Sequence, residues 1–194
     1  MVKNEKVLHQ TLATRLFHWT LFFTTIFLII SGFYITYPFI QGLPMRTIKT
    51  IHATSAFIFM SNLAGYTYYY IFSKQWYHII LSWRDLREFP GFLSYVFFLR
   101  KEHPFYGKYN PGQKLIYTSW FLTGLGLSVT GLALKFKGPM LALFTPYLNI
   151  SSLRLLHYYL AVYFAATIPI HIYLALTENP VKLQAIFSGY LRRK

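Results

Sequence analysis

The sequence predicts an all-α integral membrane protein: a bundle of four spanning helices, with surface helices in the loop between the second and the third. Only 12% of its 194 residues are charged and 55% are hydrophobic, whereas soluble domains carry about 25% charged residues. Four segments approach the roughly 20 apolar residues that a spanning helix needs, and none alternates with a period of two as a strand would. We expect one transmembrane domain over residues 1–194, with spans at about 16–37, 50–72, 115–134 and 155–177.

The four predicted spans differ in character. The first holds one titratable group, His18, before Tyr34. Its apolar run is longer than that of a signal peptide and no small-x-small cleavage site follows, so we expect it to be retained. The second span is more polar and has His52 near its start. The third contains glycines but no histidine, and the fourth contains Pro169, which we expect to kink the helix.

The loop between the second and third spans carries two apolar patches that are too short to cross a membrane. They cover residues 76–83 and 92–99, and the charged segment 84–90 separates them. Aromatic residues mixed with basic ones are typical of helices that lie in the membrane interface. We therefore expect surface helices in this loop.

The distribution of positive charge predicts the orientation. With the N-terminus inside, fourteen of the lysines and arginines fall in inner segments and five in outer ones. We therefore expect a multi-pass protein of the bacterial inner membrane with both termini in the cytoplasm. This topology accounts for the net charge of +14, so no nucleic-acid partner is needed. The lack of cysteine excludes disulfides, iron–sulfur ligation by this chain and covalent haem attachment.

Four histidines fall within the predicted spans, and their depths pair up. His18 and His171 lie near the inner ends of the first and fourth spans. His52 and His157 lie near the outer ends of the second and fourth spans. Ionisable groups inside a bilayer are costly and usually functional. The other three histidines fall in loops or surface segments, where we expect ordinary exposed side chains: His9, His78 and His103.

The spacing on the fourth span indicates what the histidines do. His157 and His171 are 14 residues apart, which places them about 40° apart around a helix and about 21 Å apart along it. One helix would then present imidazoles to one bundle interior at two depths, and the histidines of the first two spans match those depths. Two neutral imidazoles fill both axial positions of a haem iron, so this pattern predicts two non-covalent b haems. The alternative is that each histidine only bonds a neighbouring helix, and that glycines such as Gly32 and Gly131 serve plain helix packing.

Several features together resemble one known family, the di-haem cytochrome b subunit of membrane-bound formate dehydrogenases (the gamma subunit). The b-type cytochrome subunits of nickel–iron hydrogenases and of thiosulfate reductases are similar. The features are Arg15-Leu16-Phe17-His18-Trp19, Ser31-Gly32, His52, the His157 and His171 pair, and Lys108-Tyr109-Asn110-Pro111-Gly112-Gln113-Lys114.

The resemblance implies a ligand set and a substrate. His52 would pair with His157 on an outer haem, and His18 with His171 on an inner haem. A quinone, menaquinone or ubiquinone, would react beside the inner haem, where Asn110 and Gly112 would help to form its site. From these two residues alone, Asn-Pro-Gly also reads as the turn that starts the third span.

The resemblance also implies partners. An iron–sulfur subunit would dock on the outer face, and the catalytic subunit would be a formate dehydrogenase, a hydrogenase or a related reductase. Electron flow in either direction fits, so the chain would serve quinone reduction or quinol oxidation within an oxidoreductase complex. A second hypothesis is a transporter or a passive membrane anchor without haem, for which Asn62 and Pro169 are the supporting residues.

Overall fold

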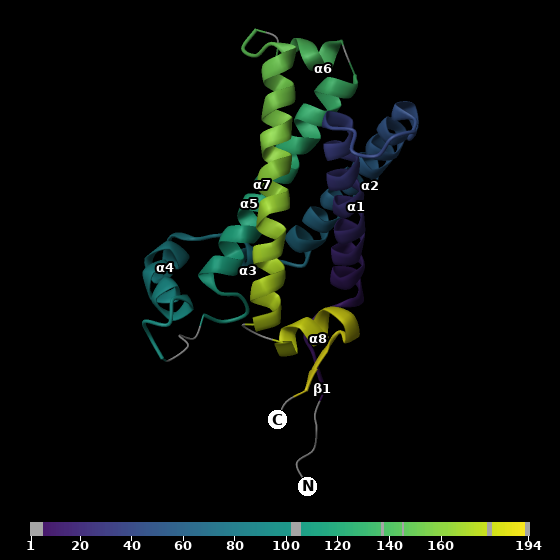
Figure 1. Cartoon of the computed structure of the whole chain (residues 1–194). Helices are drawn as coiled ribbons and strands as arrows, with labels where there is room; N and C mark the ends of the chain where they lie inside the picture. Colours follow the sequence, from purple (N-terminus) through teal and green to yellow (C-terminus); the bar gives the residue numbers. More distant parts are fainter. Residues whose placement is uncertain (1–5, 102–105, 137, 145, 178–179, 193–194) are drawn as a thin grey trace. The chain divides into compact units, whose positions relative to one another are not determined.

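The computed structural model describes residues 6–101, 106–136, 138–144, 146–177 and 180–192, and it is built almost entirely of helices (Figure 1). Four helices of 25 to 28 residues are separated by short ones, and two short strands lie near the chain ends. In chain order the elements are β1 (Lys6–Leu8), α1 (Leu12–Thr36), α2 (Met45–Phe72), α3 (Trp76–Ile79), α4 (Trp83–Val96), α5 (Pro111–Lys135), α6 (Pro139–Ala142), α7 (Ile150–Thr177), α8 (Pro180–Ser188) and β2 (Tyr190–Arg192).

The chain forms two compact units. Unit 1 comprises Met1–Thr67 and Ala161–Lys194, and unit 2 comprises Tyr68–Leu160. Helices α2 and α7 each run from one unit into the other. The contacts described below are those within each unit.

Each long helix begins four or five residues before the span predicted from hydropathy, and in α1 and α5 polar capping residues extend the helix beyond the apolar run. The Thr11 hydroxyl accepts from the backbone N–H of Thr14 at the start of α1. At the start of α5, Asn110 and Gln113 form a reciprocal capping box, and Pro111 occupies the first helical position. Among the described residues, α1, α5 and residues 150–176 of α7 are long and apolar enough to cross a membrane.

Helix α2 has the length of a spanning helix but is more polar than the other three. It covers 28 residues, so the second predicted span is a helix throughout. Its apolar character falls short of what the other three long helices reach. The second predicted span is therefore confirmed as a helix.

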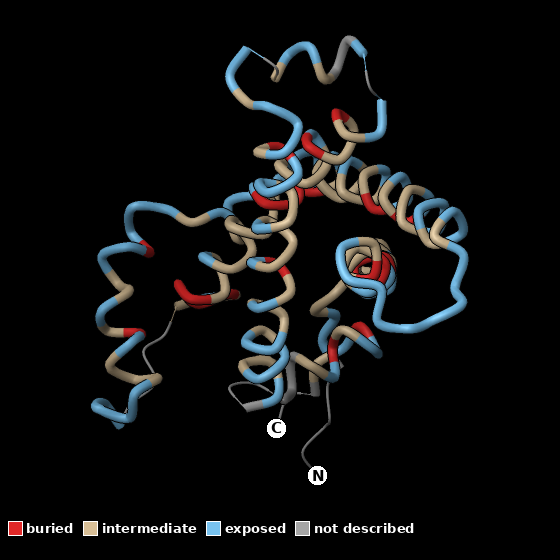
Figure 2. The backbone as a smooth tube through the Cα atoms, turned by 45° about the horizontal axis from the view of Figure 1, so that its top comes forward, coloured by how far each residue is buried: buried red, intermediate tan, exposed pale blue. Residues whose placement is uncertain are grey.

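The long helices bury polar side chains and expose apolar ones, which is the reverse of a soluble protein. Phe23, Phe27 and Ile30 of α1 are each more than half exposed. Figure 2 shows only short buried stretches along helices that are otherwise intermediate or exposed. A surface of this kind is stable in lipid and not in water. The buried residues of α1 are Thr14, Thr24, Thr25, Ser31 and Tyr34.

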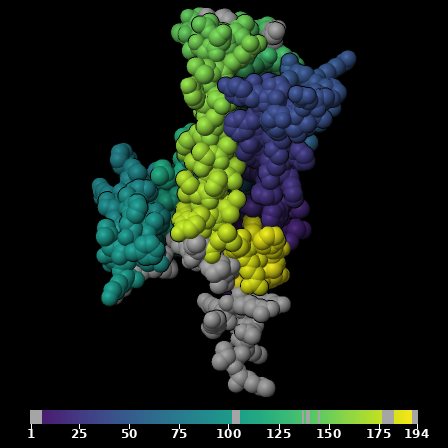
Figure 3. All heavy atoms as spheres, in the orientation of Figure 1, coloured from purple at the N-terminus to yellow at the C-terminus, as the bar shows by residue number. Residues whose placement is uncertain are grey.

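In unit 1, the two ends of the chain are joined to each other and to the start of α1. Strand β1 pairs antiparallel with β2 in the register Lys6 to Arg192. The Trp19 indole of α1 donates to the Ile186 carbonyl of α8 at 3.3 Å and packs on the Phe187 ring. Figure 3 shows the yellow atoms of α8 against the purple atoms of α1. These contacts anchor α1 one residue from His18.

In unit 2, α4 differs from the expectation for the loop. The charged segment 84–90 was expected to separate two surface helices, but it lies inside α4. The reason is a capping box between Ser82 and Asp85, which starts the helix at Trp83, one residue before the charged segment. Helix α4 buries Asp85 and Phe92 and leaves Trp83 exposed, so it is amphipathic, as expected of an interfacial helix.

Candidate functional site

His52 is held by two consecutive small residues of α1. Its Nδ1 lies 2.9 Å from the Ser31 hydroxyl oxygen, and that serine is only 5% exposed. The next residue is Gly32, where a Cβ atom would lie 3.3 Å from His52 Cε1. That approach is closer than an ordinary van der Waals contact, so the glycine allows the imidazole to lie directly against the α1 backbone.

His157 has the same surroundings in unit 2, built from α5. Its Nδ1 lies 2.8 Å from the Thr130 hydroxyl oxygen, and Thr130 is only 3% exposed. A Cβ at Gly131 would again lie 3.3 Å from the imidazole Cε1. A hydroxyl residue followed by glycine therefore contacts both His52 and His157 in the same way. The glycines were singled out from the sequence, but Thr130 was missed, although the match of Ser31-Gly32 with Thr130-Gly131 could have revealed it.

His18 and His171 come together within unit 1. They lie on α1 and on the C-terminal half of α7, close enough for their charges to interact. The Trp19 ring meets the His18 ring edge-on at 5.3 Å. Buried His18 Nδ1 has no hydrogen-bond partner among the residues described. Both predicted inner ligands therefore belong to unit 1, whereas His52 and His157 belong to different units.

These histidines fit a haem in their chemistry. A porphyrin supplies four of the six ligands of its iron, so two neutral imidazoles complete the set without carboxylates or thiolates. The glycines beside the imidazoles of His52 and His157 and the buried ring nitrogen of His18 are features that a cofactor site explains. His78 lies on α3, and His103 lies outside the described residues.

Asn110 and Gly112, the predicted quinone contacts, have clear structural roles in unit 2. The Asn110 side-chain oxygen accepts from the Gln113 backbone N–H at 2.7 Å, and the residue is 5% exposed. A Cβ at Gly112 would lie 2.5 Å from two ring carbons of Phe92, so glycine is required for α4 to pack on α5. The Asn-Pro-Gly segment therefore starts a helix, as the sequence allowed, and any quinone role comes in addition.

A buried ion pair beside this segment was not foreseen from the sequence. Lys114 Nζ lies 2.8 Å from Asp85 Oδ1, and their side chains are 15% and 6% exposed. Burial raises the pKa of the Asp85 carboxyl, but hydrogen bonds from Lys114 and Ser82 outweigh it and leave the pKa below its usual value. Burial, with the charges of Lys108 and Lys114, lowers the pKa of His78. The only sequence signal for the ion pair was the Ser82-x-x-Asp85 spacing, which is typical of a capping box.

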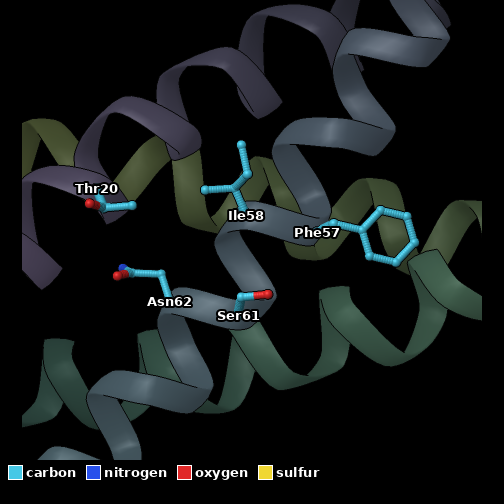
Figure 4. A pocket seen from close by; sticks show the side chains of 5 residues that line it. All are labelled: Thr20, Phe57, Ile58, Ser61 and Asn62. Atoms are coloured by element: carbon cyan, nitrogen blue, oxygen red, sulfur yellow. The ribbon is translucent and has the colours of Figure 1, made fainter.

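Asn62, one of the two residues that favoured transport, lines a pocket of about 450 Å³ between α1 and α2 in unit 1. Figure 4 shows Thr20 of α1 and Asn62 of α2 facing each other across it. The Asn62 amide donates to the Phe17 carbonyl at 2.9 Å and so ties the two helices together. Helix α7 continues through Pro169 without a break. Both residues therefore have a place in a helical scaffold.

A comparison with known families distinguishes the cytochrome hypothesis from the transporter or anchor hypothesis. The family model for prokaryotic cytochrome b561 matches residues 9–189, which include all four span histidines. The chain belongs to the prokaryotic cytochrome b561 family. This cytochrome is accordingly a membrane electron-transfer protein that carries haem of b type and works with redox partners. No curated protein matches the chain at a significant level.

Proposed function

We propose that this cytochrome b561 carries two bis-histidine b haems and passes electrons between an iron–sulfur subunit on the outer face and the quinone pool. His18 and His171 would ligate the inner haem, and His52 and His157 the outer one. The observation that carries the proposal is that all four histidines lie on long helices inside the matched region. Bound haem b supplies reversible one-electron chemistry at an iron with no open axial position.

A bundle of four spans is part of the proposal. Helices α1, α5 and α7 are the apolar spans, and pairing of β1 with β2 brings the two ends of the chain together. Chain ends on one side of a membrane require an even number of crossings, which supports α2 as the fourth. The excess of lysine and arginine in the segments on that side supports a cytoplasmic location for both ends in the inner membrane of a bacterium.

The assignment of the inner ligand pair is supported by proximity, because His18 on α1 and His171 on α7 lie within electrostatic range of each other in unit 1. The outer pair rests on likeness, since His52 and His157 have the same hydroxyl and glycine contacts. Two imidazoles held in the same way on different helices are suited to the same task, which supports their assignment to one iron.

The quinone site is proposed at Asn110 and Gly112, at the cytoplasmic start of α5. The Asn110 side chain has both an acceptor and a donor end, and its oxygen caps the helix. Its amide nitrogen is the end suited to donate to a quinone carbonyl. The quinone would be menaquinone or ubiquinone, and the catalytic subunit a formate dehydrogenase, a hydrogenase or a related reductase.

The test is to count haems in the purified cytochrome and its histidine variants. We expect two haems per chain, loss of the inner one in His18→Ala or His171→Ala, and loss of the outer one in His52→Ala or His157→Ala. Reduced-minus-oxidised spectra and haem extraction measure both. The control is His78→Ala, because His78 lies on the short helix α3. A count below one in fully loaded wild-type protein, or both haems intact in a span variant, would refute the ligand set.

A further inference from the structure

His52 and His157 each share a hydrogen bond with a hydroxyl group, and the oxygens around that hydroxyl fix the direction of the bond. Ser31 Oγ lies 2.5 Å from the Phe27 carbonyl oxygen, and Thr130 Oγ1 lies 2.7 Å from the Gly126 carbonyl oxygen. Two oxygens this close need a proton between them, and a carbonyl has none to give. Each hydroxyl therefore donates its single proton to a backbone carbonyl of its own helix.

The direction of the histidine bond follows from this donation. Because each hydroxyl has already donated its proton, it can only accept from the imidazole Nδ1 at 2.9 Å in His52 and 2.8 Å in His157. Nδ1 must then carry the ring proton, which leaves the lone pair on Nε2. The Leu28 carbonyl oxygen also lies 3.3 Å from Ser31 Oγ and is a second acceptor beside this hydroxyl.

We infer that Ser31 and Thr130 are positioning residues that hold His52 and His157 in the Nδ1–H tautomer, so that each binds iron through Nε2. Gly32 and Gly131 complete the arrangement, because a side chain there would press on Cε1 and turn the ring. This inference rests on the proposed function, since it assumes that the two histidines ligate a haem.

The arrangement also tunes the iron. A hydrogen bond accepted from Nδ1–H makes the imidazole a stronger electron donor, which stabilises ferric over ferrous iron. Buried His18 Nδ1 has no partner of this kind among the residues that the structure describes. Removing either hydroxyl should therefore shift the outer haem toward the reduced state and leave the inner haem unchanged.

The experiment is a redox titration of the purified, haem-loaded cytochrome, followed by haem absorbance, with low-spin EPR of the oxidised protein. In Ser31→Ala and Thr130→Ala, the ferrous-to-ferric ratio of one haem at fixed potential should rise roughly three- to tenfold, the worth of one hydrogen bond. The EPR signal of the same haem should shift. The conservative variants Ser31→Thr and Thr130→Ser should give the wild-type potential and EPR signal, because each keeps a hydroxyl group and introduces the residue type found at the other site.

Two matched controls test whether any hydroxyl loss has the same effect. Thr24 on α1 and Ser128 on α5 bond carbonyls of their own helices, so Thr24→Ala and Ser128→Ala should leave both titrations unchanged. Unchanged titration and EPR in both alanine variants would overturn the inference while the haem count upholds the proposed function. If an alanine variant loses its haem, retention of the haem in the matching hydroxyl variant supports the inference, and loss there too overturns it. A wild-type protein without haem would defeat the proposed function itself.

Discussion

Replacing Lys114 by methionine removes the cation from the buried ion pair between α4 and α5. The Asp85 side chain is 6% exposed and its Oδ1 lies 2.8 Å from Lys114 Nζ. Loss of one partner of such a pair costs about 3–5 kcal/mol, because a charge is left in a poorly solvated place. Asp85 Oδ2 keeps the Ser82 backbone N–H at 2.8 Å, so we expect the lower end, about 3 kcal/mol.

The assay is denaturant unfolding in detergent micelles, followed by tryptophan fluorescence. The double variant Asp85→Asn with Lys114→Met should recover much of the stability, because no unpaired charge remains. The control is Arg84→Met, which breaks the exposed 2.8 Å ion pair with Glu88 on the same helix and should have almost no effect. If Lys114→Met unfolds at the same denaturant concentration as Arg84→Met, the argument from burial is wrong.

The same pair predicts a pH dependence. Hydrogen bonds from Lys114 and Ser82 outweigh burial and hold the pKa of Asp85 below its usual value. Its contribution to stability is therefore complete above that usual value and is lost as the pH falls through the lowered pKa. In Lys114→Met the pKa of Asp85 rises and protonation removes an unpaired buried charge, so the stability lost on acidification should be smaller than in the wild type, as denaturant unfolding at a series of pH values measures.

Two further predictions concern unit 2. Gly112→Ala should lower stability by about 1–3 kcal/mol through overpacking against Phe92, and Phe92→Leu should restore part of it; thermal unfolding measures both. Loss of quinone binding at full stability would instead assign Gly112 to the quinone alone. The pKa of His78, measured from its ring resonances by NMR, should lie below that of a free imidazole and should rise in Lys108→Gln. An unchanged pKa in this variant would show that the charge of Lys108 does not affect His78.

The positions of the long helices and of the ligand candidates could be read from the chain alone, because hydropathy and charge are properties of each residue in order. The predicted spans are helices in the structure, with α2 the polar one, as expected. The family resemblance was confirmed over residues 9–189. The starts of the helices were placed four or five residues too late, since caps such as Asn110 are polar and hydropathy does not detect them, whereas their C-terminal ends agree to within one residue.

What only the tertiary structure decided is which side chains meet across helices. Thr130 and His157 are 27 residues apart, and Lys114 and Asp85 are 29 apart. Nothing local in the sequence shows that a threonine faces a particular imidazole, because the contact depends on how two helices are rotated against each other. The sequence alone thus named the histidines, while helix packing selected the hydroxyl groups that contact His52 and His157 and the ion pair that joins α4 to α5.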